Sequence, residues 1–208
     1  QEVRDSLAHS GARPLQWLLD HAPVDERWCL VHATHLDDAE RQAAARRGAV
    51  IGLAPTTEAN LGDGLFDLPA WRGAWGIGSD SHASVDAAEE LRLLEYGQRL
   101  LRQQRNVAVA EDLWRSAVAG GAQAAGREIA GLAVGQQADW LVLADAMFEG
   151  LSPAQQLASH LFASQRRDAV AQVWVAGRRV IDNGRHAEGE AAERGFLAAR
   201  ARLLEALR

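Results

Sequence analysis

Two short apolar segments of the chain end in residues with reactive side chains. One ends in His32 and His35, and the other, residues 76–79, ends in Asp80 and His82. An aspartate oxygen is a good zinc ligand and can accept a proton from metal-bound water, and histidine transfers protons near neutral pH. Reactive side chains at the ends of buried strands form the catalytic face of α/β barrels. The pattern therefore predicts the catalytic end of a metal-dependent hydrolase.

Each of these residues also has a purely structural interpretation. Aspartate after a strand is common in Asx-turns and helix N-caps, and a lone histidine at a strand end often serves as a structural hydrogen-bonding group. His32 and His35 are three residues apart, so an extended backbone directs their side chains to opposite faces. We expect His32 to face the catalytic end and His35 to lie in the following loop.

Residues 55–64 follow a predicted strand and are expected to form a loop. Glu58 and Asn60 lie in it, and together with His82 they are candidate substrate-binding residues, because loops after barrel strands build pockets. Asn, Asp and Gly are also the commonest turn residues, so the residue types alone leave both interpretations open.

The composition bounds the class of protein. The 208 residues are 48% hydrophobic with a net charge of −6, which argues against a nucleic-acid or anionic-membrane partner. The single cysteine, Cys29, excludes a disulfide framework and fits a reducing, cytoplasmic compartment. No apolar segment approaches the roughly 20 residues of a membrane span. The chain opens at Gln1 without a signal-peptide pattern, and we expect it to be part of a longer protein.

Strands and helices alternate in the first part of the chain. Strands are predicted over 28–33, 49–53 and 75–79, and helices over 3–20 with a break at 11–14, 37–47, 86–104 and 111–120. This alternation implies parallel strands with helical crossovers. The helix over 86–104 is expected to bury Ala88, Leu91, Leu94 and Leu101.

The pattern changes after about residue 126. A strand is predicted over 138–143, and two further strands over 170–176 and 179–181 form a hairpin. The tail over 188–208 reads as a helix anchored by Phe196, Leu203 and Leu207. We therefore expect three regions: a partial barrel over 1–126, β-sandwich strands over 127–187 and a C-terminal helix over 188–208.

The segments 30–35, 57–64 and 76–82 together resemble the amidohydrolase superfamily, and within it the formimidoylglutamate deiminases. Residues 138–140 and 173–178 match the generic tail of the superfamily. The resemblance implies an α/β fold: the C-terminal part of a (β/α)8 TIM-type barrel, about strands 6–8, followed by strands of a small β-sandwich and a C-terminal helix.

The resemblance also implies a reaction. Asp80 matches the aspartate after the eighth barrel strand, which ligates zinc and shuttles a proton, and His32 matches the catalytic histidine after the sixth strand. The expected activity is zinc-dependent hydrolysis of N-formimino-L-glutamate to N-formyl-L-glutamate and ammonia in histidine degradation. One Zn²⁺ is expected per site, with Asp80 as the metal ligand in this chain. The family's other metal ligands are absent, so we expect this chain alone to be inactive. Its partner would be a small-molecule substrate, and a homodimer is possible.

Two alternatives remain open. Another deaminase of the superfamily, acting on guanine, a nucleoside or a triazine, usually carries Pro-x-Ser-Asn where this chain has residues 57–60, Thr-Glu-Ala-Asn. The other alternative, from a different class, is a non-catalytic remnant or a subunit that needs a partner half.

Overall fold

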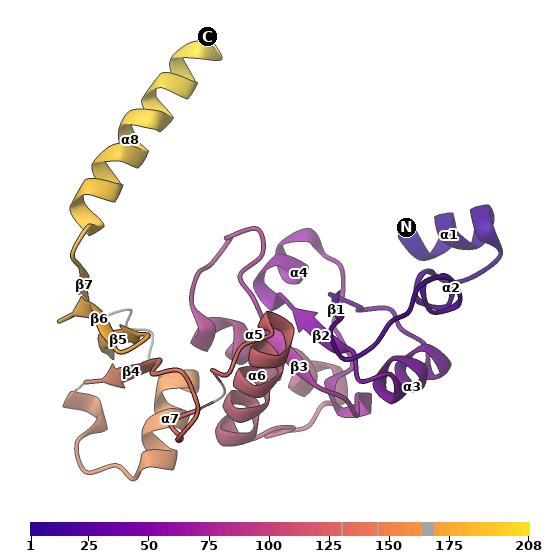
Figure 1. The fold of residues 1–208 in the computed structure, drawn as a ribbon, viewed down its shortest axis with the longest axis horizontal. Helices are drawn as coiled ribbons and strands as arrows, with labels where there is room; N and C mark the ends of the chain where they lie inside the picture. The colour runs from indigo at the N-terminus through magenta and orange to yellow at the C-terminus, as the bar shows by residue number, and fades with distance from the viewer. Residues whose placement is uncertain (130, 145, 164–168) are drawn as a thin grey trace. The chain divides into compact units, whose positions relative to one another are not determined.

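The computed structural model describes residues 1–129, 131–144, 146–163 and 169–208 (Figure 1). These residues form two compact units. The first comprises residues 1–131 and 151–164, and the second comprises residues 132–150 and 165–208. Residues 151–164 thus belong to the first unit, although we predicted a separate β region over 127–187.

The first unit is built on a parallel sheet of order β1-β2-β3, formed by β1 (Cys29–Val31), β2 (Val50–Leu53) and β3 (Trp75–Ile77). All three strands were predicted, and their parallel pairing confirms the α/β fold. Parallel strands place their carboxyl ends at one edge of the sheet. The segments that follow β1, β2 and β3 therefore start from neighbouring positions.

Helices pack around this sheet, and two of them begin at an aspartate that caps the helix N-terminus. The Asp37 carboxylate accepts from Glu40 N at 2.9 Å, and the Glu40 carboxylate accepts from Asp37 N at 3.1 Å, which completes a capping box. Asp86 accepts from the backbone N–H of Ala88 at 2.8 Å. The helices of this unit are α1 (Glu2–Ser10), α2 (Pro14–His21), α3 (Asp38–Arg46), α4 (Pro55–Leu61), η1 (Leu68–Ala70), α5 (Ala87–Arg102), α6 (Ala110–Ala125) and α7 (Pro153–Phe162).

The core of the first unit is formed by the sheet together with buried residues of α2, α3, α5, α6 and α7. On α5, Ala88, Leu91 and Leu94 are buried as predicted, but Leu101 is 58% exposed, so that prediction was wrong. At about 100° per residue, Leu101 lies about 80° around the helix from Leu91, whereas Gln98 lies only about 20° away. Gln98 therefore occupies the buried face, where its Nε2 donates to Phe66 O at 2.8 Å.

Helix α6 packs directly on the backbone of β3. A Cβ at Gly120 would lie 1.9 Å from the carbonyl oxygen of Trp75, and a Cβ at Gly76 would lie 2.8 Å from Gly121 N. Only glycine permits so close an approach of two backbones. The glycines at this contact thus allow α6 to pack against the strand that leads to Asp80.

The second unit contains an antiparallel sheet of order β4-β5-β6-β7. The predicted hairpin joins β5 to β6 through Ala176 and Gly177, whose φ angles of 50° and 73° match the two-residue turn that hairpins favour. The unit consists of β4 (Trp140–Leu143), η2 (Ala146–Phe148), β5 (Val170–Val175), β6 (Arg178–Asp182), β7 (Arg185–His186) and α8 (Gly189–Ala206).

Helix α8 covers nearly all of the predicted C-terminal helix. None of its residues is buried, and the predicted anchors Phe196, Leu203 and Leu207 are all exposed. The prediction of anchoring was therefore wrong for this chain, since its described residues bury no face of the helix. Among the described residues, no helix is long and apolar enough to span a membrane.

Candidate active site at the carboxyl ends of the parallel strands

His32 directly follows β1 at the carboxyl edge of the sheet. Its backbone N–H donates to Gly52 O at 2.7 Å, which extends the pairing with β2. The chain then leaves the strand abruptly, with positive φ angles of 62° at His32 and 50° at Ala33. Such angles are costly for residues other than glycine, and they concentrate at functional sites. The sharp turn holds the His32 ring at the strand end.

Glu58 comes from the first turn of α4, which follows β2. Its Oε1 lies 3.2 Å from His32 Nδ1 and accepts from Ala54 N at 3.0 Å. The Glu58 side chain is only 5% exposed. A carboxylate at this position accepts a hydrogen bond from Nδ1–H, so we assign a proton to Nδ1 of His32. This arrangement leaves Nε2 of His32 available for a second interaction.

Asp80 lies three residues beyond β3 and is the third member of a group of side chains with His32 and Glu58. Its Oδ2 is 3.7 Å from His32 Nε2, longer than a hydrogen bond but within ion-pair distance. The Asp80 side chain is 45% exposed, so its carboxylate is accessible, unlike that of Glu58. His32 therefore has a buried carboxylate at one ring nitrogen and an accessible carboxylate near the other.

The segment after β2 differs from the prediction. Residues 55–61 form α4, so Glu58 and Asn60 lie on a helix rather than in a loop. Pro55 at the first helical position presets the backbone, and Gly62 ends the helix with a φ of 74°. This pairing of an N-terminal proline with a C-terminal glycine is the signal in the sequence that could have identified the helix.

The structure brings together some of the predicted site residues and leaves others apart. His32, Glu58 and Asp80 form the group described above. Asn60 and His82 are exposed, and within the described residues no hydrogen bond joins either side chain to that group. A substrate contact for these two residues stays a prediction.

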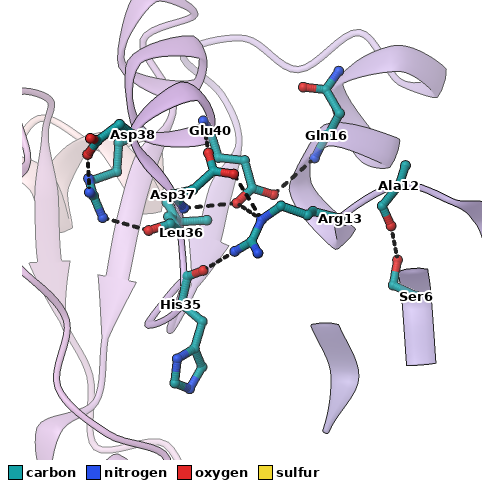
Figure 2. Close-up of polar contacts among 10 residues, drawn as sticks. Ser6, Ala12, Arg13, Gln16, His35, Leu36, Asp37, Asp38 and Glu40 are labelled. Atoms are coloured by element: carbon teal, nitrogen blue, oxygen red, sulfur yellow. Dashed lines mark hydrogen bonds and ion pairs between the residues drawn. The ribbon is translucent and has the colours of Figure 1, made fainter. Parts of the chain in front are cut away.

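His35 lies in the exposed turn after β1, as predicted. Its carbonyl oxygen accepts from the Arg13 guanidinium, and its ring extends away from these contacts (Figure 2). Arg13 Nε also lies 2.7 Å from Glu40 Oε2 and 3.2 Å from Asp37 Oδ2. The hydrogen bond to Glu40 raises the pKa of Arg13, and Arg13 stays charged. It fastens α2 and α3 to the turn beyond His32, a role that no local sequence pattern indicated.

A hollow of about 930 Å³ lies beside β1 in the first unit. His32, Thr34, His35 and Asp63 contribute to its wall, and further residues come from α1, α2 and β1. Val31, on β1, is 60% exposed, so this edge of the sheet is open. The volume is typical of a small-molecule binding site. His32, which contacts Glu58 and Asp80, forms part of the wall of this hollow.

The described residues do not form a zinc site by themselves. Among them, no group of three or more His, Cys, Asp or Glu side chains is arranged to hold a metal ion. A catalytic zinc needs about three protein ligands besides water. Asp80 offers one accessible carboxylate, and any further ligands would have to come from outside the described residues.

The sequence matches the amidohydrolase family over residues 4–180. The formimidoylglutamate deiminase of Pseudomonas aeruginosa is 51% identical, in an alignment that covers 99% of this chain and 48% of that protein. The 5-methylthioadenosine/S-adenosylhomocysteine deaminase of Bacillus cereus is 29% identical, over 88% of this chain and 44% of that protein. The chain thus spans about half the length of the curated relatives that it matches.

Two solved structures have a similar fold. An amidohydrolase from Brucella melitensis is 42% identical, with a TM-score of 0.93 over 98% of this chain and 47% of that chain. An adenosine deaminase from Xanthomonas campestris with bound zinc is 29% identical, with a TM-score of 0.82 and the same coverage.

Proposed function

The chain belongs to the amidohydrolase family, and on this basis we propose that it forms the C-terminal part of a formimidoylglutamate deiminase. The complete protein would hydrolyse N-formimino-L-glutamate to N-formyl-L-glutamate and ammonia, in cytoplasmic histidine degradation. In this proposal β1, β2 and β3 are barrel strands 6–8, and the antiparallel sheet is part of a β-sandwich. The observation that carries the proposal is spatial: Glu58, His32 and Asp80 come together just beyond the ends of three adjacent parallel strands.

The geometry suggests a separate role for each of the three side chains. Glu58 holds the His32 ring through Nδ1. Asp80 acts as the general base: it takes a proton from the water that adds to the formimino carbon and passes it to the imino nitrogen. It then relays the remaining hydroxyl proton of the adduct to the same nitrogen, so that the C=O bond forms as the C–N bond breaks and ammonia leaves. His32, whose Nε2 faces Asp80, stabilises negative charge that develops beside it when Nε2 carries a proton.

Zinc would be the cofactor of the complete protein, with Asp80 as one ligand. When bound, it would supply a water molecule whose pKa is lowered to about 7. We propose that the 208 residues alone neither retain zinc nor turn over substrate, because their described part provides too few ligands for a site.

The experiment compares this chain with a complete protein, made by joining residues 1–208 to the N-terminal half of the P. aeruginosa relative. Zinc content is measured by mass spectrometry, and ammonia release is measured with N-formimino-L-glutamate. We expect both in the complete protein and neither in the chain alone. Tight zinc binding with turnover by the chain alone would contradict the assignment.

Asp80→Asn tests the proposed base within the complete protein. The amide has nearly the same shape but cannot accept the proton, so turnover should fall at least about 10²-fold, the low end for a positioned acid–base group. Asp112→Asn, on the exposed surface of α6, is the matched control and should leave turnover unchanged. Equal turnover in both variants would refute the role of Asp80.

A nucleoside deaminase is the second candidate function, because the B. cereus deaminase is also related over 88% of this chain. The 51% identity to the formimidoylglutamate deiminase favours the first candidate. Assaying the complete protein with adenosine, 5-methylthioadenosine and N-formimino-L-glutamate separates the two.

A further inference from the structure

The hydroxyl of Thr57 contacts the loop on both sides of Asp80. Thr57 Oγ1 lies 3.4 Å from the carbonyl oxygen of Ser79, 3.2 Å from the backbone nitrogen of Ser81 and 2.9 Å from Ser81 Oγ. Thr57 itself is 1% exposed, so these contacts are made away from solvent. One buried side chain thus contacts the residues immediately before and after Asp80, the proposed base.

The hydrogen-bonding capacity of this hydroxyl is fully used. The carbonyl oxygen of Ser79 can only accept, so Thr57 donates its single proton there. The backbone N–H of Ser81 can only donate, and the Ser81 hydroxyl must then donate as well. One donated and two accepted bonds exhaust what a threonine hydroxyl can make. No other arrangement satisfies all three contacts.

Asp80 needs such support because its own conformation is costly. Its φ angle is 39°, in the left-handed region that non-glycine residues rarely adopt, and His82 follows with a φ of 56°. Strained backbone of this kind persists only where surrounding contacts determine it. The Asp80 side chain is 45% exposed, and its Oδ2 lies 3.7 Å from Nε2 of His32.

The turn of α4 that carries Thr57 is held firmly on both sides. Thr56 donates its backbone N–H and its hydroxyl to the Glu90 carboxylate, at 2.9 and 2.6 Å. Burial raises the pKa of Glu90, although these two hydrogen bonds oppose the increase. On the other side, Glu58 contacts His32. Thr57 therefore reaches the Asp80 loop from the same rigid turn that orients His32.

We propose that Thr57 is a positioning residue that sets the place of the Asp80 carboxylate relative to His32. The proposal rests on the function proposed above, because it assumes that these two side chains act together. The hydroxyl matters for the rate rather than for substrate affinity, since Thr57 is buried behind the loop and does not reach the open side of the site.

The test uses three variants of the complete protein. Thr57→Val removes the hydroxyl at nearly constant shape, and Thr57→Ser retains it. Thr56→Val is the matched control: it also removes a buried hydroxyl from the same turn and contacts neither Ser79 nor Ser81, and it keeps the backbone N–H bond that holds the turn to Glu90. For each variant, kcat and KM for deimination, the urea midpoint and the crystal structure are determined.

We expect Thr57→Val to lower kcat at least about 10-fold with little change in KM, since displacements of about 1 Å can cost 10²-fold in rate. Its crystal structure should show residues 79–81 displaced. Thr57→Ser should stay within about 3-fold of the parent in kcat. Thr56→Val should lose stability but keep kcat within about 3-fold. Loss of kcat in proportion to stability in both valine variants, or an unmoved loop in Thr57→Val, would overturn the proposal.

Two further outcomes are decisive. If the parent protein releases no ammonia, the proposed function fails, whereas the crystal structures still decide whether Thr57 positions the loop. Should Thr57→Val not fold, Ser81→Ala removes one of the three contacts from the exposed side. We then expect kcat to fall about 3-fold, and an unchanged kcat would overturn the proposal.

Discussion

Replacing Gly120 by alanine should push α6 away from β3. The added Cβ would meet the carbonyl oxygen of Trp75 at 1.9 Å and its carbonyl carbon at 2.3 Å, where real Cβ atoms stay beyond 3.0 Å. Both atoms belong to the backbone of β3 at its contact with α6, so no side-chain rotation relieves the clash. The helix must move by about 1 Å, since 3.0 Å is the shortest permitted approach.

The expected cost follows from two opposing effects. Overpacking that shifts backbone costs typically about 1–3 kcal/mol, and a backbone-to-backbone clash belongs at the upper end. Alanine in a helix interior recovers about 1 kcal/mol relative to glycine. The free energy of unfolding should therefore fall by about 2 kcal/mol for Gly120→Ala.

The neighbouring Gly121 provides the control, because a Cβ there meets no atom within 4 Å. Gly121→Ala should gain up to about 1 kcal/mol from helix propensity alone. Urea unfolding followed by tryptophan fluorescence measures both variants, and Trp75 lies at the contact. If Gly120→Ala were as stable as Gly121→Ala, the close approach of α6 and β3 would be refuted.

Three further predictions concern single side chains. In the complete protein, His32→Ala should lower kcat at least about 10²-fold with the fold intact, whereas His35→Ala should act on stability or KM; equal losses of kcat would refute the assignment. Burial lowers the pKa of His160, so the folded state disfavours its protonation. Stability should therefore decline as the pH falls below the ordinary histidine pKa of about 6.5, and His160→Leu should flatten this decline in urea midpoints measured from pH 8 to pH 5. Asp37→Ala should cost about 1 kcal/mol in urea unfolding through loss of the capping box, and an unchanged midpoint would show that the cap contributes nothing.

Features that depend on residues close together in the chain could be predicted from the sequence. The capping box of α3, the cap of α5 and the hairpin between β5 and β6 all depend on side chains or φ angles within a few positions. The same holds for the placement of His32 and Asp80 just beyond strands. Helix α4 was missed because its residues resembled a loop, although its proline and glycine marked both ends.

Contacts between distant residues were decided by the tertiary structure alone. His32 and Glu58 are 26 positions apart, and Thr57 and Ser81 are 24 apart. No local pattern relates such pairs, because they meet only when parallel strands place their carboxyl ends side by side. The sequence by itself thus determined that reactive side chains follow directly after predicted strands. The packing of β1, β2 and β3 decided which of them face one another, since the pairing of strands sets distances that spacing along the chain does not.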